Sequence, residues 1–410
     1  MYARHRLDVS GRDLLFALAA CVSARGGRAD AVARGWAGPS GLACLSVRSS
    51  FDLLLEALDL PSGSEVVMSA VTHPDMVRIV RAHGLRPVAV DLDLETLAPP
   101  TDLLEDAVTD ASRMVVVAHL FGSRADLGPA VAVARRHGLL LVEDCAQVLR
   151  GPLDCGDERA DVSLFSFGPI KAATALGGAL VRVRDPDLLA RMRSIQARWP
   201  VQTRHAYAAK AAKFLVLLGL GRPLPFGLLA RLCRVAGRNF DAILTDFVRS
   251  RRSDADLVAF ARQRPSAPLL ALVERRLRRF GHDRLRRRIA RAEALRRELP
   301  EWLEHPGAAA AEHVHWVFPV LSESRADLAA SLRDAGVDAA AGTTAIALVE
   351  EAESTPEAER LLAHVLFLPA YPELPARAFR RLVEVLRASG RDSHVPCLAP
   401  DAARPRRARR

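Results

Sequence analysis

Short apolar runs alternate regularly with amphipathic segments across residues 43–185, and few folds accommodate this pattern. The runs occupy residues 65–70, 87–90, 114–118, 139–142, 162–167 and 179–183, with helix-like segments such as 50–60, 74–83 and 127–137 between them. Strands that are buried on both faces read as continuous apolar runs, and their alternation with helices is typical of a mostly parallel sheet. We therefore predict a three-layer α/β domain here.

The pattern changes after residue 186, where long arginine-rich helical stretches are separated by prolines, and an α/β pattern returns over residues 312–392. We predict an N-terminal helical segment (1–42), a large domain (43–202), a helical insertion (203–261), a long linking helix (262–299), a small C-terminal domain (300–392) and a basic disordered tail (393–410). A chain of 410 residues is long enough for two domains with separate cores.

Polar side chains follow several predicted strands, at the sheet edge where open α/β proteins bind their ligands. They are Thr72, His73, His119, Asp144, Gln147, Ser166 and Lys171. Lys171 is unusual because only three of the 58 basic residues are lysines, at positions 171, 210 and 213. A lysine amine can form an imine with an aldehyde or ketone, whereas an arginine guanidinium stays protonated. Lys171 is therefore a candidate catalytic amine, and a plain surface position is the alternative.

Three motifs occur in close succession after the fourth apolar run: Asp144-Cys145-Ala146-Gln147, Ser166-Phe167-Gly168-Pro169-Ile170-Lys171 and Gly177-Gly178. Together they resemble the motifs of the pyridoxal-phosphate-dependent sugar aminotransferases of the DegT/StrS type. Further matches are Gly63–Val66, Ala70–His73, Asp91–Asp93, His119–Gly122, Arg124–Asp126, Trp316–Val320 and Leu368–Pro372. The resemblance covers residues 43–200 and 262–390.

The resemblance implies a fold-type-I enzyme that uses pyridoxal 5′-phosphate. In this fold a mostly parallel three-layer domain carries a smaller C-terminal α/β domain, and here a helical insertion is added. Lys171 is implied to hold the cofactor as a Schiff base and to move a proton between Cα and C4′. Asp144 is implied to keep the pyridine nitrogen protonated, which makes the ring an electron sink.

Further cofactor contacts are implied residue by residue. Gln147 is placed near the phenolic oxygen, Ser166 at the phosphate and His73 against the ring. Arg48 and Ser49 occupy the family's phosphate turn at the start of the 50–60 helix, in the form V-R-S without the usual glycine. A helix N-terminus suits a phosphate, and an arginine adds a bidentate cation. Arg262 occupies the position of an asparagine that reaches the cofactor phosphate of the partner subunit.

The implied reaction moves an amino group from an amino acid donor, for which the family suggests glutamate, to a keto sugar nucleotide or a related cyclitol ketone. The implied assembly is a homodimer with active sites at the subunit interface. A lipid-linked or other non-nucleotide acceptor is the alternative substrate. A sugar 3-dehydratase of the same fold would carry histidine at position 171, and an inactive sensor or scaffold would have lost Lys171 or Asp144.

Several histidines admit two interpretations. His119 is either a packed core residue or a residue on the substrate side of the site. His313 and His315 lie two positions apart and would project from one side of a strand, which is compatible with a zinc pair. Because no third ligand with suitable spacing follows them, we predict no metal site.

The segment 203–261 has no counterpart in the family pattern. Its apolar stretch, residues 213–233, is interrupted by Arg222, Pro223 and Pro225, so we do not expect a membrane-spanning helix. Extra packing around the active-site mouth or the dimer edge is one interpretation. A peripheral contact with a membrane or a partner protein is the other.

The composition of the chain limits which binding partners and which cellular compartment we expect. The formal net charge is +10, but part of it lies in the tail at 404–410, and no aromatic platform accompanies the arginine runs. We therefore expect small-molecule substrates and no nucleic acid. Six cysteines without paired spacing and a weak N-terminal apolar stretch indicate a reduced, cytoplasmic protein.

Overall fold

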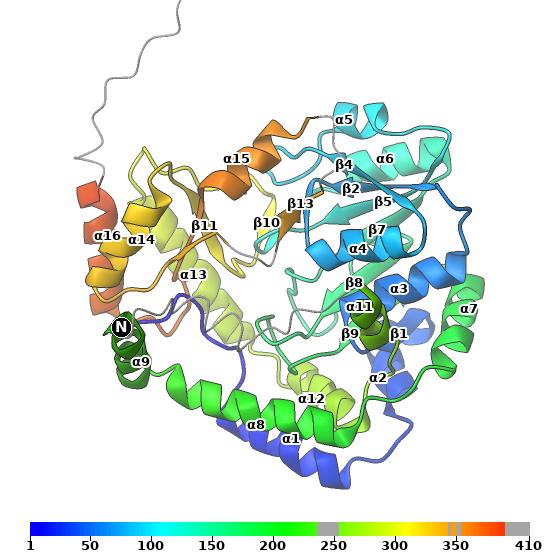
Figure 1. The fold of residues 1–410 in the computed structure, drawn as a ribbon, viewed down its shortest axis with the longest axis horizontal. Coiled ribbons are helices and arrows are strands. Elements are labelled where there is room, and N and C mark those ends of the chain that lie inside the picture. The colour runs from blue at the N-terminus through cyan, green and yellow to red at the C-terminus, as the bar shows by residue number, and fades with distance from the viewer. Residues whose placement is uncertain (236–253, 343–345, 350–353, 390–410) are drawn as a thin grey trace, which may run out of the picture.

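The computed structural model describes residues 1–235, 254–342, 346–349 and 354–389 (Figure 1). A seven-stranded sheet with the strand order β1-β9-β8-β7-β5-β2-β4 forms the centre of the large domain. The strands are β1 (Gly41–Cys44), β2 (Glu65–Ser69), β4 (Arg86–Val90), β5 (Ser112–Ala118), β7 (Leu140–Asp144), β8 (Val162–Ser166) and β9 (Ala179–Val183). Neighbouring strands pair in parallel except at β9, which runs antiparallel to β1 and β8. The predicted mostly parallel α/β sheet is thus confirmed.

Helices cover both faces of this sheet because the apolar side chains of each strand alternate between them. Met114 and Val116 of β5 share one core cluster with α3 (Val47–Leu58), α4 (Pro74–Ala82) and α7 (Pro186–Ala197). Val115 and Val117 of the same strand pack on the other face with α5 (Thr101–Asp106) and α6 (Gly128–His137). At the β1-β9-β8 end, that second face is covered by α1 (Gly11–Ser23), α2 (Arg28–Ala37), α8 (Arg204–Leu220) and α12 (Ala267–Arg278).

The small domain has its own sheet, in which β14 (Val365–Leu368) pairs antiparallel with β11 (Phe318–Leu321) and β12 (Ala340–Ala341). Its core also includes residues of α13 (His282–Glu298), α14 (Arg325–Asp334) and α16 (Ala376–Ser389). The remaining helix, α15 (Pro356–His364), packs against the large domain through Ala358 and Leu361.

Two short antiparallel pairs join the domains. One pairs β10 (Glu312–His313) with β6 (Ser123–Arg124), and the other pairs β13 (Ala347–Leu348) with β3 (Val71–Thr72). The N-terminal segment is a third link, since Tyr2 forms a parallel bridge with Val337 of the small domain before the chain enters α1. These links hold the opposing surfaces of the two domains in fixed register.

The linking helix predicted over residues 262–299 is two helices, α12 and α13, with a break at residues 279–281. Gly281 precedes α13 as its N-cap residue, and glycine has the weakest helix propensity after proline. Phe280 packs against the core cluster beneath α12 instead of continuing the helix. The break lets α12 stay on the large domain while α13 crosses to the small domain (Figure 1).

The insertion contains α8, α9 (Pro223–Val235) and α11 (Asp254–Ala261), while residues 236–253 and the predicted tail lie outside the described residues. Tyr207, Ala211 and Phe214 of α8 join the core formed with α1. Among the described residues, no single helix has the length and hydropathy to span a membrane, although α8 and the following stretch to Cys233 meet those criteria together as a pair bent by 93°. Leu224, Leu228 and Leu232 are exposed along α9.

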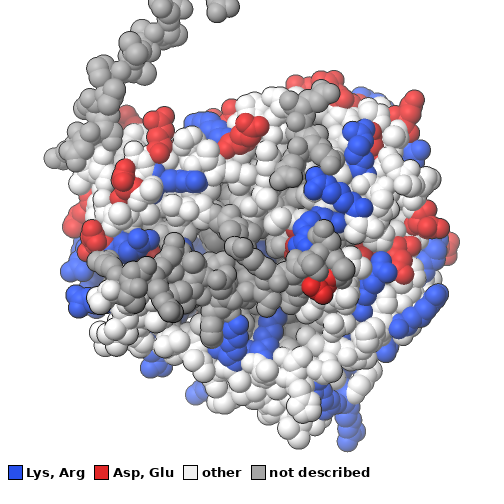
Figure 2. All heavy atoms as spheres, in the orientation of Figure 1, with Lys and Arg blue, Asp and Glu red and all other residues white. Residues whose placement is uncertain are grey.

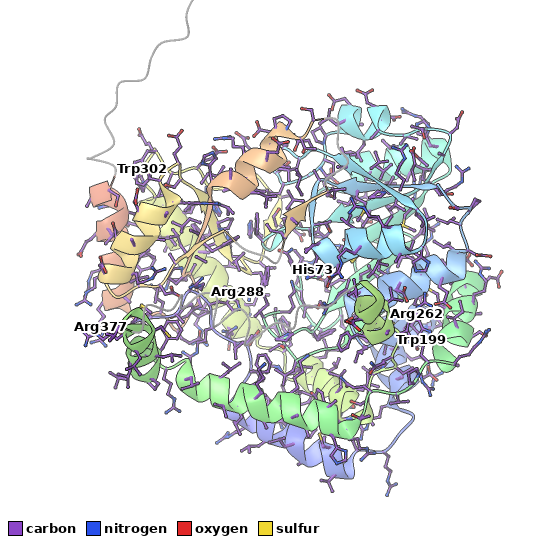
Figure 3. All side chains as sticks on the ribbon, in the orientation of Figure 1. His73, Trp199, Arg262, Arg288, Trp302 and Arg377 are labelled. Carbon is purple, nitrogen blue, oxygen red and sulfur yellow. The ribbon has the colours of Figure 1, made fainter. Side chains whose placement is uncertain are left out.

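Acidic and basic side chains are interspersed on the face of the molecule shown in Figure 2. Figure 3 shows the side chains on the same view, with Arg288 in the middle of the molecule, and with Trp199 and Arg262 near α11 at one side. Trp199 belongs to the core cluster that contains α3 and α7, so this side is an ordinary packed layer of the large domain.

Candidate active site

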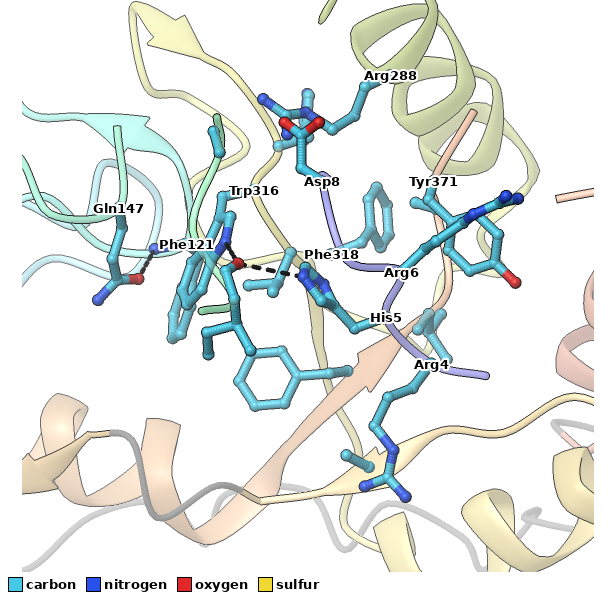
Figure 4. Close-up of a pocket in the computed structure, with 18 of the residues that line it drawn as sticks. Arg4, His5, Arg6, Asp8, Phe121, Gln147, Arg288, Trp316, Phe318 and Tyr371 are labelled. Carbon is cyan, nitrogen blue, oxygen red and sulfur yellow. Dashed lines mark hydrogen bonds between the residues drawn. The ribbon is translucent and has the colours of Figure 1, made fainter. Parts of the chain in front are cut away.

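A cavity of about 680 Å³ lies between the two domains and the N-terminal segment (Figure 4). This volume is in the usual range for small-molecule sites. Its large-domain wall includes Phe121, Gln147, Ile170, Lys171 and Ala172. The opposite wall is formed by residues 4–8, by α13 and α14, and by a segment that runs through Trp316.

The side chain of Lys171 reaches this cavity from the loop after β8. Its Nζ atom lies 3.9 Å from the centroid of the Trp316 ring, a cation–π arrangement that favours the protonated amine. The preceding carbonyl, Ile170 O, accepts hydrogen bonds from Trp316 Nε1 at 2.8 Å and from His5 Nε2 at 3.2 Å (Figure 4). Both contacts come from the wall opposite the lysine, so that wall positions the loop.

The backbone after Lys171 is strained. Ala173 has a φ of 50°, in the left-handed region that costs a residue with a side chain about 1 kcal/mol or more. The Asp8 carboxylate accepts a hydrogen bond from the Ala173 N–H at 2.9 Å and thereby stabilises this turn. Burial raises the pKa of Asp8, but Arg284 and Arg276 lower it by more, so the pKa stays below its usual value and the carboxylate is ionised at neutral pH.

Asp144 ends β7 and is 8% exposed. Its Oδ1 accepts a hydrogen bond from the Ala146 N–H at 2.9 Å, as a residue capping a turn does. Burial raises the pKa of Asp144 above its ordinary value, and the charge of Lys171 acts in the opposite direction. A buried carboxyl whose pKa is raised in this way becomes fully ionised when a cation is placed against it.

Gln147 lines the cavity three residues further on. Its Oε1 accepts a hydrogen bond from the Phe121 N–H at 2.8 Å, which fixes the orientation of the amide group (Figure 4). The two amide N–H groups are then the donors that Gln147 can offer to a ligand oxygen. Gln147 and Lys171 therefore line the cavity, whereas Asp144 is not among its lining residues and is linked to the cavity through the charge of Lys171.

Ser166 lies at the end of β8, where its hydroxyl accepts a hydrogen bond from the Gly168 N–H at 3.3 Å. The N-terminus of α3 follows β1, and β1 and β8 both run antiparallel to β9, so their carboxyl ends share one edge of the sheet. Ser49 is fully buried there and its N–H donates to the capping Ser46 hydroxyl at 3.1 Å. The Ser50 N–H donates to the Ser46 carbonyl at 3.0 Å, so the N–H groups of Val47 and Arg48 are the ones in this first turn that an anion could use.

Arg48 is paired with an acidic side chain of α4. Its Nη1 donates to the Asp75 carboxylate at 2.8 Å, and Arg78 contacts the same carboxylate at 2.9 Å. His73 precedes α4 as its N-cap residue, and its Nδ1 accepts from the Asp75 N–H at 3.1 Å (Figure 3). Its side chain is 42% exposed.

Arg262 is held within its own chain. Its guanidinium contacts Asp52 at 3.0 Å and Glu56 at 3.4 Å, both on α3. Asp52 is completely buried and is also contacted by His83 at 2.9 Å, so Arg262 contributes to the charge balance of a buried carboxylate.

His119 is 1% exposed and does not line the cavity. Its Nδ1 accepts from the Ala125 N–H at 3.1 Å, so the neutral ring carries its proton on Nε2, which donates to Glu143 at 2.8 Å. Arg124 contacts the same carboxylate at 3.0 Å. Both ring nitrogens of His119 are therefore engaged in the core, in keeping with the first of the two interpretations offered by the sequence.

The cavity also contains residues that sequence reasoning missed. Trp316 lies in a recognised motif, but that motif assigned it no role. His5 and Asp8 carried no signal, because their partners in the lysine loop are 165 residues away along the chain. Arginines predominate among the charged groups of the cavity, where Asp8 is the one acid among the described lining residues.

Comparisons with known proteins agree with this arrangement. Residues 38–214 match the sequence model of the DegT/DnrJ/EryC1/StrS aminotransferase family. The UDP-N-acetyl-3-dehydro-alpha-D-glucosamine 3-aminotransferase of Acidithiobacillus ferrooxidans is 32% identical over 168 residues, which are 40% of this chain and 46% of that protein. The L-glutamine:2-deoxy-scyllo-inosose aminotransferase of Streptomyces kanamyceticus is 36% identical over 152 residues, 36% of this chain and 35% of that protein.

The crystal structure of the aminotransferase TlmJ from Streptoalloteichus hindustanus superimposes with a TM-score of 0.72 at 22% identity, covering 96% of this chain and 99% of that one. The fold of these enzymes therefore extends over nearly the whole chain. The sequence matches are shorter, since the chain spans less than half the length of the curated relatives it matches.

Proposed function

Because residues 38–214 match the sequence model of the DegT/DnrJ/EryC1/StrS aminotransferase family, we propose that this chain is a pyridoxal-phosphate-dependent aminotransferase. The observation that carries the proposal is the placement of Lys171 at the cavity, close enough to the buried Asp144 for its charge to oppose the rise that burial causes in the pKa of that carboxyl. This pair supplies an amine and an acid in the roles that such an enzyme requires.

The residues at the ring end fit the cofactor. Asp144 would hold the pyridine nitrogen, since its burial favours an ion pair with a cation, and the Gln147 amide would donate to the phenolic oxygen. Ser166 and the N-terminus of α3, with Ser49, would face the phosphate, and His73 would lie against the ring. Bound pyridoxal phosphate supplies an aldehyde that exchanges amino groups and a ring that delocalises the electron pair left at the substrate Cα.

Lys171 acts in this scheme through its amine, which holds and moves a proton at the substrate Cα. The position of the Lys171 side chain is fixed by contacts from the opposite wall. There the Trp316 ring lies against Nζ, and Trp316 Nε1 donates to the Ile170 carbonyl. His5 adds a second donor to that carbonyl, and the pKa of His5 is lowered to about 4 by burial and by Arg288, so its ring is neutral at pH 7.

The substrates are proposed from the charge of the cavity and from the family. Arg4, Arg6, Arg284, Arg288 and Arg333 line it. Although Arg4 pairs with Asp338 at 2.7 Å and Arg284 with Asp8 at 3.2 Å, the surplus of guanidinium groups favours anionic ligands. We therefore propose glutamate as the amino donor and a keto sugar nucleotide as the acceptor, with a cyclitol ketone or a lipid-linked acceptor as the alternatives.

The test is the absorption spectrum of the full chain purified with pyridoxal phosphate, recorded before and after addition of glutamate. We expect a visible band that is absent from Lys171→Ala and that glutamate converts toward the pyridoxamine phosphate spectrum. Lys210→Ala is the matched control, because Lys210 lies on α8 outside the cavity lining. The absence of a Lys171-dependent band would reject the aminotransferase and favour a scaffold.

We also propose a homodimeric, cytoplasmic enzyme, as the family and the cysteine pattern suggest. Sedimentation velocity of the full chain is expected to give a dimer at micromolar concentration. In the dimer, Arg262 is expected to keep its contacts with Asp52 and Glu56 in its own chain. An Arg262→Ala variant that remained dimeric but bound pyridoxal phosphate at least 10-fold more weakly would instead place Arg262 near the cofactor of the partner.

For the insertion 203–261 we propose a peripheral contact with a membrane surface. The exposed leucines 224, 228 and 232 recur every four residues and form one apolar stripe along α9. Vesicles of mixed anionic lipid should sediment the full chain, and Leu228→Asp should reduce the bound fraction. Equal binding of both proteins would reject this contact.

A further inference from the structure

Three histidine side chains converge at the base of the small domain, next to the cavity but apart from Lys171. His313 ends β10, His315 follows two residues later, and His305 comes from the preceding loop. One ring nitrogen from each lies within 4.8 Å of the other two. His305 and His315 are 7% and 4% exposed, so the cluster is almost sealed from solvent.

Two of these rings present an unprotonated nitrogen to the cluster. His305 Nδ1 lies 2.7 Å from the Pro319 carbonyl, which can only accept, so Nδ1 carries the proton and Nε2 holds the lone pair. His315 Nε2 lies 3.3 Å from a Glu293 carboxylate oxygen, which leaves the lone pair on Nδ1. His305 Nε2 and His315 Nδ1 are both buried and have no hydrogen-bond partner among the described residues.

The hydrogen bonds of His305 and His315 are those of metal-binding histidines, although all three rings are stacked and must turn before they can share an ion. A histidine ligand typically donates its other ring N–H to a carbonyl or carboxylate, which fixes the tautomer and orients the ring. Here Pro319 and Glu293 provide those acceptors without any metal in place. Two buried ring nitrogens without partners destabilise the folded chain, and a cation would recover that loss.

His313 supplies the third nitrogen after a small rearrangement. Its Nδ1 accepts from the His315 N–H at 2.9 Å, so its buried and unpartnered Nε2 carries a proton. Coordination through Nε2 requires the other neutral tautomer, so one proton leaves Nε2 for solvent and one is taken up from solvent at Nδ1. The protonated Nδ1 can no longer accept from the His315 N–H, and the ring turns away from that amide. The rings of His313 and His315 are stacked 3.8 Å apart, and the stack must open because a metal lies in the plane of each ligating ring.

The surroundings leave room for this movement. Gly307 has a φ of 83°, and a Cβ on it would lie 3.5 Å from His313 Nε2 and 2.9 Å from Leu97. Any other residue at this position would therefore have a strained backbone, and its side chain would occupy the space next to the His313 ring. His315 also has a left-handed φ, of 44°, which is unusual for a residue with a side chain and turns its ring back toward His313.

We propose that His305, His313 and His315 bind one divalent transition-metal ion of the zinc class, with three imidazole nitrogens and one water. Imidazole ligands suit Zn²⁺ and its neighbours, whereas Mg²⁺ and Ca²⁺ require oxygen ligands. The nearby Arg288 opposes the cation, and Glu293 offsets that charge.

A second cluster serves as the internal contrast. His119, Glu143 and Cys145 also bring ligand atoms within 4.8 Å of one another. Its imidazole and carboxylate are already paired with each other, and Arg124 occupies the carboxylate as well. Burial and the charge of Glu143 hold the pKa of Cys145 well above its ordinary value, so the thiol stays protonated. This cluster is satisfied without a metal.

A bound ion would join β10, the preceding loop and the segment leading to Trp316. His315 directly precedes Trp316, whose ring faces Lys171, and His305 stacks on Phe318 with ring centroids 4.3 Å apart. The ion would thus stabilise one wall of the cavity without touching the reacting groups. The proposal rests on the histidines alone and holds whether or not the chain is an aminotransferase.

The test is titration of the full-length, metal-free protein with Zn²⁺ against a chromogenic chelator. We expect one ion per chain, at least 100-fold weaker binding by His305→Gln and His315→Gln, and 10- to 100-fold weaker binding by Glu293→Gln. His137→Gln, at an exposed histidine that also contacts a glutamate, and Cys145→Ser are the matched controls and should bind as the wild type does.

Binding that is equally tight in wild type and in the His305→Gln/His315→Gln double variant, or that is lost in either control, would overturn the proposal. Co²⁺ keeps the test decisive if a histidine variant fails to fold. The wild type should then show the ligand-field bands of a tetrahedral site and no thiolate-to-metal charge-transfer band. A thiolate band would assign the ion to cysteine and reject this site.

Discussion

The two walls of the cavity differ in how their residues are brought together. On the large-domain side, Gln147 and Lys171 of the cavity lining and the buried Asp144 behind that lining follow neighbouring parallel strands, so the sheet itself delivers them to one edge. On the opposite wall, His5 and Asp8 come from the N-terminal segment and Trp316 from a segment more than 300 residues later, and all three act on the lysine loop from outside. The first wall supplies reactive groups, and the second orients them.

This difference explains what the sequence could reveal. Asp144 and Lys171 lie in short motifs at the ends of strands whose order follows from local connections, so pattern and resemblance were sufficient to find them. The extended segment 4–8 has no periodicity, and its position depends on ion pairs with α12 and α13. Nothing within ten residues of His5 predicts its contact with Ile170.

The largest expected effect concerns the reactive wall. Asp144→Asn should slow the half-reaction with glutamate by about 10²- to 10³-fold, because a neutral amide cannot hold a protonated ring nitrogen. Rapid-mixing absorbance measurements with saturating pyridoxal phosphate would check it. Asp154→Asn, which alters another buried carboxylate outside the cavity lining, is the control. If the half-reaction rate of Asp144→Asn stayed within 10-fold of that of wild type, Asp144 would not have the proposed role at the ring nitrogen.

A smaller effect is expected at the orienting wall. Trp316→Ala removes both the ring over Lys171 and the hydrogen bond to Ile170 O, and should slow the same half-reaction about 10-fold. Trp316→Phe keeps a ring and loses the hydrogen bond, so its half-reaction rate should lie between the rates of wild type and Trp316→Ala. A pH profile separates the contributions, because loss of the cation–π contact should also move the pKa of the Lys171 amine downward. Identical profiles for all three proteins would contradict this role.

The same contrast applies to the histidines at 305–315. The sequence prediction of no metal site rested on the residues after His315, whereas the third imidazole, His305, precedes the pair by eight positions. Spacing along the chain cannot show that a loop folds back onto its own strand. The single helix predicted over 262–299 is in fact two helices, because Phe280 packs against a core cluster that residues distant in sequence build.

His5 permits a test of the orienting wall by stability. Its folded-state pKa of about 4 is below the ordinary value of 6.5, so the unfolded chain takes up the proton first as the pH falls. The stability that the neutral ring contributes is present above pH 6.5 and is lost toward pH 4. Between pH 7 and pH 5, the free energy of unfolding of wild type should fall by about 1–2 kcal/mol more than that of His5→Gln. Urea titrations at both pH values would measure this, and equal losses would show that His5 is solvated.

The smallest expected effect lies at the phosphate end of the large-domain wall, where sequence and structure diverge. The resemblance assigns Arg48 to the phosphate, yet its guanidinium contacts Asp75 at 2.8 Å, with 31% and 13% of the two side chains exposed. An ion pair of this exposure is worth about 1 kcal/mol or less. If Arg48 stays with Asp75, Arg48→Ala should weaken pyridoxal phosphate binding by less than about 5-fold in a spectroscopic titration.

The companion variant Asp75→Asn frees Arg48 without removing it, so the two substitutions give opposite outcomes in the two arrangements. If Arg48 still contacts Asp75 when the cofactor is bound, Arg48→Ala hardly changes the affinity for pyridoxal phosphate. Asp75→Asn then raises that affinity, because the guanidinium becomes available to the phosphate. With Arg48 already on the phosphate, Arg48→Ala weakens binding by 30-fold or more and Asp75→Asn changes little. The second outcome would mean that the large-domain wall also rearranges when it binds the cofactor, and that its residues are not all delivered by the sheet alone.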